Sequence, residues 1–167
     1  DAATADAMDA LGTYYAAHAQ PHNAEPLHRE AWRIHEKALA KDDPRTLRSV
    51  QYLADAHFNL NKTDEALTFY QQAHEGRLRV LGPDHLDTLG SRAGVGNALN
   101  RQGQWTEGTA VQQECLDAFL RIVGPKSLYT INQQRFVAAG LESLGRLDDA
   151  ERVYRAALSA AIEAYGP

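Results

Sequence analysis

Four of the seven histidines lie within the first 35 residues, and closely spaced histidines often mark a metal site. His18 and His22 are four residues apart, a spacing that places two side chains on one face of a helix. Pro21 falls between them at an expected turn, however, and the sequence supplies no clear third or fourth ligand. In the internal repeat described below, His18 and His28 occupy positions that hold leucine and tyrosine in other repeats, so we interpret both as packing residues. We therefore predict no metal ion and no other cofactor.

The other reactive residue types do not form an active site. Cys115 is the single cysteine, and its neighbours do not mark it as an activated thiolate, so we expect it to be buried and inert. Asp42-Asp43 and Asp148-Asp149 stand at expected helix starts, where carboxylates stabilise the helix end. Gly94-Val95-Gly96 lacks the third glycine of a dinucleotide-binding loop, and neither a phosphate-binding loop nor a nucleophile elbow is present. We predict that the protein is not an enzyme.

Composition excludes two classes of partner. The 167 residues include 22 acidic and 17 basic side chains, and the net charge of −5 disfavours direct nucleic-acid binding through a basic surface. No stretch approaches the ~18 consecutive apolar residues of a membrane span. Thirteen arginines against four lysines suit a bacterial source, and the use of a single cysteine suits a reducing cytoplasm. Both chain ends coincide with boundaries of the repeat described next, so we expect a segment of a longer protein.

A repeat of 42 residues runs through the chain. The segment Gly82–Thr88 (GPDHLDT) recurs as Gly124–Thr130 (GPKSLYT), and related residues occur at Asp43–Thr46 and Gly166-Pro167. Periods of 20–50 residues indicate stacked structural units. The predicted units are residues 1–42, 43–84, 85–126 and 127–167, which together form one solenoid domain.

Small residues recur at three positions of each unit, separated by spacings that fit a helical period. We interpret these positions as places where two helix backbones approach closely, and a larger side chain there would cost roughly 1–3 kcal/mol. The three columns hold Gly12, Ala54, Gly96 and Ala138; Ala24, Ala66, Gly108 and Ala150; and Ala31, Ala73, Cys115 and Ala157.

Each unit is predicted to contain two antiparallel helices, a leading helix A and a second helix B. The turn between them falls near Asn61, Gly103 and Gly145, residues that suit a left-handed helix end. The Gly-Pro pairs between units end helix B. The first unit departs most from the pattern, because Pro21 and Pro26 lie near its turn, and we expect it to be a divergent or partly irregular unit.

The clearest unit reads Asn-Lys-Thr-Asp-Glu-Ala-Leu-x-x-Tyr-x-x-Ala from Asn61 to Ala73 and ends in the linker Gly-Pro-Asp-His-x-Asp-Thr. These residues resemble the tetratricopeptide repeat, in its 42-residue kinesin light chain-like variant. The resemblance implies an all-α fold, a right-handed α-solenoid of four antiparallel helix pairs, eight helices in all. It also implies that helix A lines the concave side and helix B forms the outer wall.

The resemblance further implies an adaptor that holds a peptide or a helix in a concave groove. In the first unit the inward positions of helix A are Asp6, Asp9, Ala10 and Thr13. In the later units amide, guanidinium and aromatic side chains at inward positions suit a peptide backbone. The predicted peptide-binding residues are Arg48, Gln51, Tyr52, Asn97, Asn100, Asn132, Arg135 and Phe136.

Within that groove we predict a recess with Gly90 and Gly94 as its floor and Tyr52 and Phe136 as its walls. The lysine and asparagine pattern of the family's clamp for chaperone tails is not met, so such a tail is not an expected ligand. The predicted function is non-enzymatic capture of a protein or peptide.

Two alternatives stay open. The array could be a scaffold that self-associates through its terminal helices, because the last helix has an apolar face formed by Val153, Leu158, Ile162 and Tyr165. It could also be a regulatory sensor segment of a larger bacterial kinase or transcription regulator. The sequence does not predict the partner's identity, the neighbouring domains or the oligomeric state.

Overall fold

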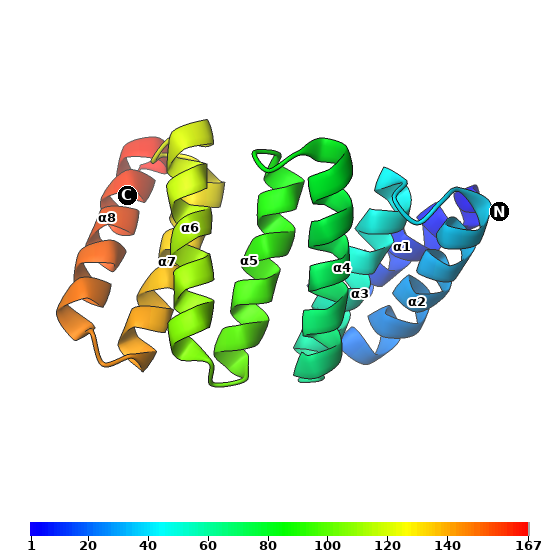
Figure 1. Cartoon of the computed structure of the whole chain (residues 1–167), viewed down its shortest axis with the longest axis horizontal. Helices are drawn as coiled ribbons and strands as arrows, with labels where there is room; N and C mark the ends of the chain where they lie inside the picture. The colour runs from blue at the N-terminus through cyan, green and yellow to red at the C-terminus, as the bar shows by residue number, and fades with distance from the viewer. Residues whose placement is uncertain (167) are drawn as a thin grey trace. The chain divides into compact units, whose positions relative to one another are not determined.

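The computed structural model describes residues 1–166, and this part of the chain contains eight α-helices and no strand (Figure 1). The helices are α1 (Ala2–Ala17), α2 (Pro21–Ala38), α3 (Pro44–Asn59), α4 (Thr63–Leu81), α5 (Leu86–Arg101), α6 (Trp105–Val123), α7 (Leu128–Ser143) and α8 (Leu147–Tyr165). The predicted all-α class is confirmed. Pro167, the last residue of the predicted fourth unit, lies outside the described residues.

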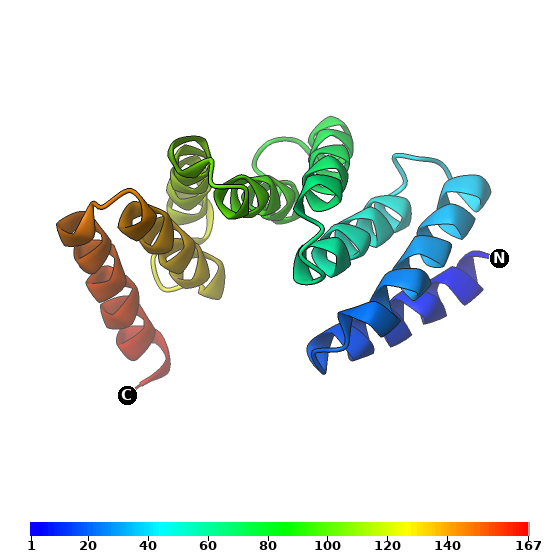
Figure 2. The ribbon, with the colours of Figure 1, turned by 90° about the horizontal axis from the view of Figure 1, so that it is seen from below.

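The helices pack as consecutive neighbours. α1 lies against α2, α3 against α4, and α7 against α8, while α2 also contacts α3 and α6 contacts α7. Figure 2 shows α1 beside α2 and α7 beside α8. The chain forms two compact units that are larger than the predicted 42-residue repeats. The first unit is residues 1–94 and the second unit begins at Val95, so the division falls within α5. Each predicted 42-residue range contains one helix pair.

Left-handed residues turn the chain between the two helices of each pair. Asn61, Gly103 and Gly145 have φ values of 60°, 80° and 74°, as the sequence predicted. In the first pair Ala19 takes this conformation, with φ of 56°. The first pair is a regular one, and α2 continues through Pro26. Of the two expectations for the first 42-residue unit, partial irregularity is therefore wrong, and divergence of its sequence remains.

The small-residue columns are places of close contact between helices. A Cβ built on Gly12 would lie 2.6 Å from the His28 ring, and one on Gly108 would overlap the side chain of Asn100. Ala24, Ala66 and Cys115 are fully buried. A larger side chain at these positions would push paired helices apart, which confirms the predicted role of the columns.

Each unit has its own apolar core. Leu47, Val50 and Leu53 on α3 are almost completely buried in the first unit. In the second unit Val137 and Leu141 on α7 pack with residues of α6 and α8. Among residues 1–166, no helix combines the length and the apolar character that crossing a membrane requires.

Candidate ligand-binding surface on the leading helices

A hollow of 410 Å³ lies on α1 and α3 of the first unit. Its lining residues are Asp6, Asp9, Ala10, Thr13, Arg48 and Tyr52. All six occupy the helix A positions that the sequence predicted to face a groove. The structure thus brings the predicted residues Arg48 and Tyr52 together with the inward positions of the preceding helix. We call this site the α1–α3 hollow.

Arg48 is the basic residue of the hollow's described lining, and it is paired with an equally accessible carboxylate. Its Nη2 donates to Asp6 Oδ1 over 2.7 Å, and Arg45 Nη1 lies 3.8 Å from the other oxygen of the same carboxylate. The side chains of Arg48 and Asp6 are 42% and 38% exposed, so this ion pair is worth only about 0–1 kcal/mol. Since a guanidinium has five N–H donors, Arg48 keeps donors for a ligand carbonyl or carboxylate.

A buried polar network lies beneath the hollow and joins α1, α2 and α3. Asp9 is only 2% exposed; His28 Nδ1 donates to its Oδ1 over 2.9 Å, and Ser49 Oγ donates to its Oδ2 over 2.5 Å. The Ser49 hydroxyl proton is thereby used, so His35 Nδ1, which lies 2.9 Å from Ser49 Oγ, must be the donor in that contact. These four side chains hold the first helices together.

The network contains the residue types of a nucleophilic triad but not its arrangement. Ser49 and His35 are fully buried, and the serine donates to the carboxylate rather than to a histidine. A substrate cannot reach this hydroxyl in the folded protein. No group of three or more His, Cys, Asp or Glu side chains within residues 1–166 could hold a metal ion. Sequence reasoning missed this network, because Asp9 was expected to face a ligand.

Gln51 points toward α4 rather than into the hollow. Arg77 Nη1 donates to Gln51 Oε1 over 3.1 Å, and Gln51 Nε2 donates to Asp55 Oδ1 over 3.2 Å. Tyr70 donates to the same Asp55 oxygen over 2.7 Å. Burial raises the pKa of Asp55, while these hydrogen bonds act in the opposite direction. Gln51 therefore connects α3 to α4.

The predicted residues of the second unit fall into two groups. Asn97 Oδ1 accepts a hydrogen bond of 2.7 Å from Gln112 Nε2, and Asn100 lies against Gly108, so both face α6. Asn132, Arg135 and Phe136 are exposed on α7, and Phe136 is 45% exposed. The exposed group combines an amide, a guanidinium and an aromatic ring on one helix.

The prediction that Gly90 and Gly94 form the floor of a recess is wrong. A Cβ on Gly94 would overlap the Tyr70 ring, so Gly94 belongs to the contact between α5 and α4. Gly90 is exposed, and apart from its chain neighbours and the adjacent α5 backbone, no atom of the described residues lies within 4 Å of a Cβ built there. Tyr52 packs on the His28 ring with centroids 5.1 Å apart. Glycine at position 94 serves helix packing and does not make room for a ligand.

Of the two histidines expected to pack, His18 departs from that role and His28 keeps it. His18 is exposed at the end of α1, where its ring stacks on Tyr14. His28 is buried as predicted, but it is fixed by a hydrogen bond to Asp9 as well as by packing.

Family models of the tetratricopeptide repeat match residues 4–45, 46–87 and 91–163. They cover most of the sequence, and the chain belongs to the tetratricopeptide repeat family. No curated protein sequence matches this one.

Solved structures show the same fold. The nearly identical TPR-like repeats of a kinesin light chain-like protein from Podosopora anserina superpose with a TM-score of 0.78 at 19% identity, over 95% of this chain and 75% of that one. BtubC (BKLC) from P. vanneervenii gives a TM-score of 0.81 at 18% identity, over 97% of this chain and 64% of that one. Aspartyl phosphate phosphatase F from Bacillus subtilis gives 0.81 at 16% identity, over 98% of this chain and 41% of that one. The predicted likeness to kinesin light chain-type repeats is confirmed.

Proposed function

We propose that this chain is a non-catalytic interaction module that captures a peptide or a partner helix on the exposed surfaces of its leading helices. Repeats of this family generally serve as protein-binding scaffolds. The observation that carries the proposal is the α1–α3 hollow, because six inward helix A residues line one cavity there. The buried, reduced state expected of Cys115 suits action in the cytoplasm.

The chemistry of the hollow suits an extended peptide. Arg48 offers N–H donors to a backbone carbonyl or an acidic side chain, and the Tyr52 ring offers an apolar face beside it. The Thr13 hydroxyl donates to Asp9 O over 2.8 Å, so its oxygen can still accept a hydrogen bond from a peptide N–H. We expect a ligand with a carboxylate or carbonyl near Arg48 and an apolar side chain on Tyr52.

The exposed α7 residues form a separate proposed surface on the second unit. Arg135 and Phe136 supply a guanidinium and an aromatic ring, as Arg48 and Tyr52 do in the hollow, and Asn132 adds an amide. Gln51, Asn97 and Asn100 remain proposed contributors, but their contacts with helix B leave them fewer groups for a ligand.

Selection from a displayed peptide library tests the proposal without a known partner. Peptides enriched on the wild-type protein should lose at least tenfold in affinity with Arg48→Glu or Tyr52→Ala, and with Arg135→Glu combined with Phe136→Ala. Arg33→Glu is the matched control, because Arg33 is an exposed arginine on a helix B. If all variants bind like the control while their helical content is unchanged, the ligand surface lies elsewhere.

Self-association is a second candidate, supported by the outer face of α8. Leu158, Ile162 and Tyr165 are exposed there at spacings of four and three residues, which place them on one side of the helix. Light scattering across a concentration series should show oligomers of the wild-type protein. The double variant Leu158→Lys and Ile162→Glu should be monomeric. A mass that stays monomeric at every concentration would exclude this candidate.

A further inference from the structure

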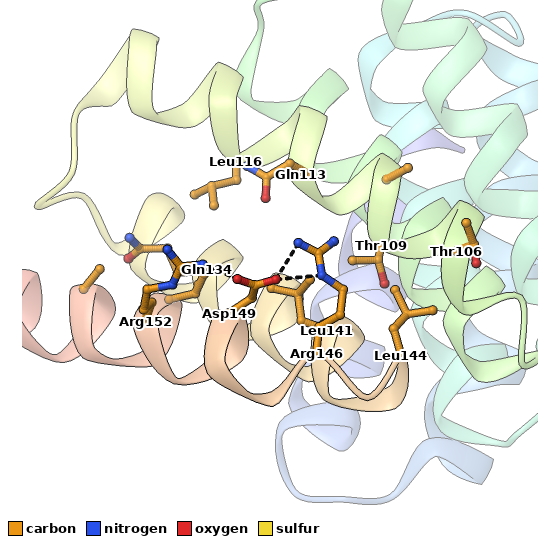
Figure 3. Close-up of a pocket in the computed structure, with 13 residues that line it drawn as sticks. Thr106, Thr109, Gln113, Leu116, Gln134, Leu141, Leu144, Arg146, Asp149 and Arg152 are labelled. Carbon is orange, nitrogen blue, oxygen red and sulfur yellow. Dashed lines mark hydrogen bonds and ion pairs between the residues drawn. The ribbon is translucent and has the colours of Figure 1, made fainter.

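A second and larger cavity lies in the second unit, between α6, α7 and α8 (Figure 3). Its volume of 640 Å³ falls within the range of about 300–1,000 Å³ that is usual for small-molecule sites. The apolar part of its lining is Ala110, Leu116, Leu141, Leu144, Val153 and Ala156. We call this cavity the α6–α8 cleft, and its described lining includes none of the proposed peptide-binding residues.

Positive charge is in excess at the rim of the cleft. Arg146 Nε donates to Asp149 Oδ2 over 2.7 Å, and Arg152 donates to the other oxygen of the same carboxylate. Figure 3 shows the Arg146 guanidinium held beside Asp149 by these contacts. Asp149 is the one carboxylate among the described lining residues. Two guanidinium groups that share one carboxylate keep several N–H donors for an anionic ligand.

Two deeply buried polar side chains of the lining are unsatisfied. Thr109 is 6% exposed and Gln134 is 8% exposed. Within the described residues, Thr109 Oγ1 and Gln134 Oε1 have no hydrogen-bond partner. A buried amide oxygen without a donor is unfavourable, and a ligand that carries an N–H group could supply that donor after a small rotation of the Gln134 side chain.

We propose that the α6–α8 cleft binds a small amphipathic carboxylate that carries an amide N–H, of the chemical class of N-acylated amino acids. The carboxylate pairs with Arg146 and Arg152 at the rim, and the amide N–H donates to Gln134. The hydrocarbon chain lies on Leu141 and Leu144. This site is separate from the proposed peptide surface and does not depend on it.

N-Octanoylglycine is the probe, measured by isothermal titration calorimetry at pH 7 with the whole chain. We expect saturable binding of one molecule per chain. N-Octanoylglycinamide lacks the charge, octanoate lacks the amide, and N-acetylglycine lacks the hydrocarbon chain. Each should bind at least tenfold more weakly, because each omits one of the three recognised groups.

Substitutions on α8 locate the binding. Ala156→Trp fills the cleft from an exposed position, and we expect it to weaken N-octanoylglycine binding at least tenfold. Ala164→Trp is the matched control, since Ala164 is exposed on the same helix and does not line the cleft. Arg152→Gln should weaken binding of the acid but leave the weak binding of the amide unchanged.

Three results would overturn the proposal. If N-octanoylglycine and N-octanoylglycinamide bound with equal affinity, the arginines would not recognise the carboxylate. Equal losses in Ala156→Trp and Ala164→Trp would place the probe on another apolar surface. Tighter binding of an acetylated tetrapeptide ending in leucine than of N-octanoylglycine would assign the cleft to a peptide carboxyl terminus instead.

Discussion

Asp9 links three helices through a single carboxylate. It lies on α1, and it accepts hydrogen bonds from His28 on α2 and Ser49 on α3. With only 2% of its surface exposed, Asp9 has almost no water to replace these partners. The contribution of this residue therefore lies in the stability of the first unit rather than in ligand contact.

Asp9→Ala should lower the free energy of unfolding by roughly 1–3 kcal/mol, because it leaves the buried His28 Nδ1–H without an acceptor and leaves the Ser49 hydroxyl only the Arg45 carbonyl oxygen, 3.2 Å away. Urea denaturation followed by circular dichroism measures the loss. Asp6→Ala is the control on the same helix; its partly exposed pair with Arg48 predicts a loss of about 1 kcal/mol or less. Similar small losses in both variants would contradict a structural role for the network.

Gly90 and Gly94 form a natural pair for testing the packing of α5. Gly90→Ala adds a methyl group in open space and should stabilise the helix by about 1 kcal/mol. Gly94→Ala places the same methyl group on the Tyr70 ring and should destabilise the protein by roughly 1–3 kcal/mol. Thermal unfolding of both variants checks the signs. A stabilising Gly94→Ala would revive the interpretation of Gly94 as an exposed groove residue.

At the scale of helices, the chain ends most elements with the residues that the repeat predicted. α4 and α6 stop directly before Gly82 and Gly124, and Asp43 accepts a backbone hydrogen bond at the start of α3, as predicted. Ser127 does the same at the start of α7. The helix ends could be predicted from the sequence because each depends on local backbone geometry and a few neighbouring residues.

The turn after α1 departs from this pattern and gives a prediction. Ala19 holds a left-handed φ that costs a residue with a side chain roughly 1–2 kcal/mol, and the equivalent turns use Asn or Gly. Ala19→Gly should therefore raise the free energy of unfolding by about 1 kcal/mol. Ala17→Gly, within the last turn of α1, should lower it by up to about 1 kcal/mol. Destabilisation by both changes would contradict the left-handed turn.

Side-chain direction on the helices was less predictable than helix position. Gln51 and Asn97 stand at positions that the repeat assigns to the inner face, yet each side chain turns to a polar partner on helix B. That choice depends on whether the facing residue happens to be polar, as Arg77 and Gln112 are. A repeat pattern predicts where the helix backbone lies. The hydrogen-bond partner of a side chain comes from another helix, and its residue type varies between repeats.

On the scale of the whole chain, polar contacts between successive helix pairs recur at equivalent positions of the 42-residue repeat. His35 on α2 lies 2.9 Å from Ser49 on α3, and Arg77, 42 residues later, donates over 2.6 Å to Ser91. At the next equivalent position Phe119 stacks on Tyr129 instead. The backbone repeat is thus kept while the chemistry of each junction changes, which lets one array carry distinct surfaces.

The dependence of overall stability on pH follows from two histidines of the first unit. Burial lowers the pKa of His57, although nearby Glu25 acts in the opposite direction and Arg29 adds to the lowering. Arg29 Nη2 lies 3.2 Å from His57 Nε2, where a neutral ring can accept but a protonated ring cannot. Burial also lowers the pKa of His74, despite its contact with the Thr88 carbonyl.

Both shifts predict that the protein loses stability in mild acid. As pH falls through about 6.5, the unfolded chain takes up protons that the folded chain excludes, so the free energy of unfolding must decrease. Urea denaturation at pH 7.5, 6.5 and 5.5 measures this slope, and Trp105→Phe leaves Trp32, which packs on Phe69, to report on the first unit. His57→Gln keeps an acceptor for Arg29 and should flatten the slope, and His22→Gln, at an exposed site on α2, is the matched control. If His57→Gln retains the full slope, the buried imidazole is not what makes the fold sensitive to acid.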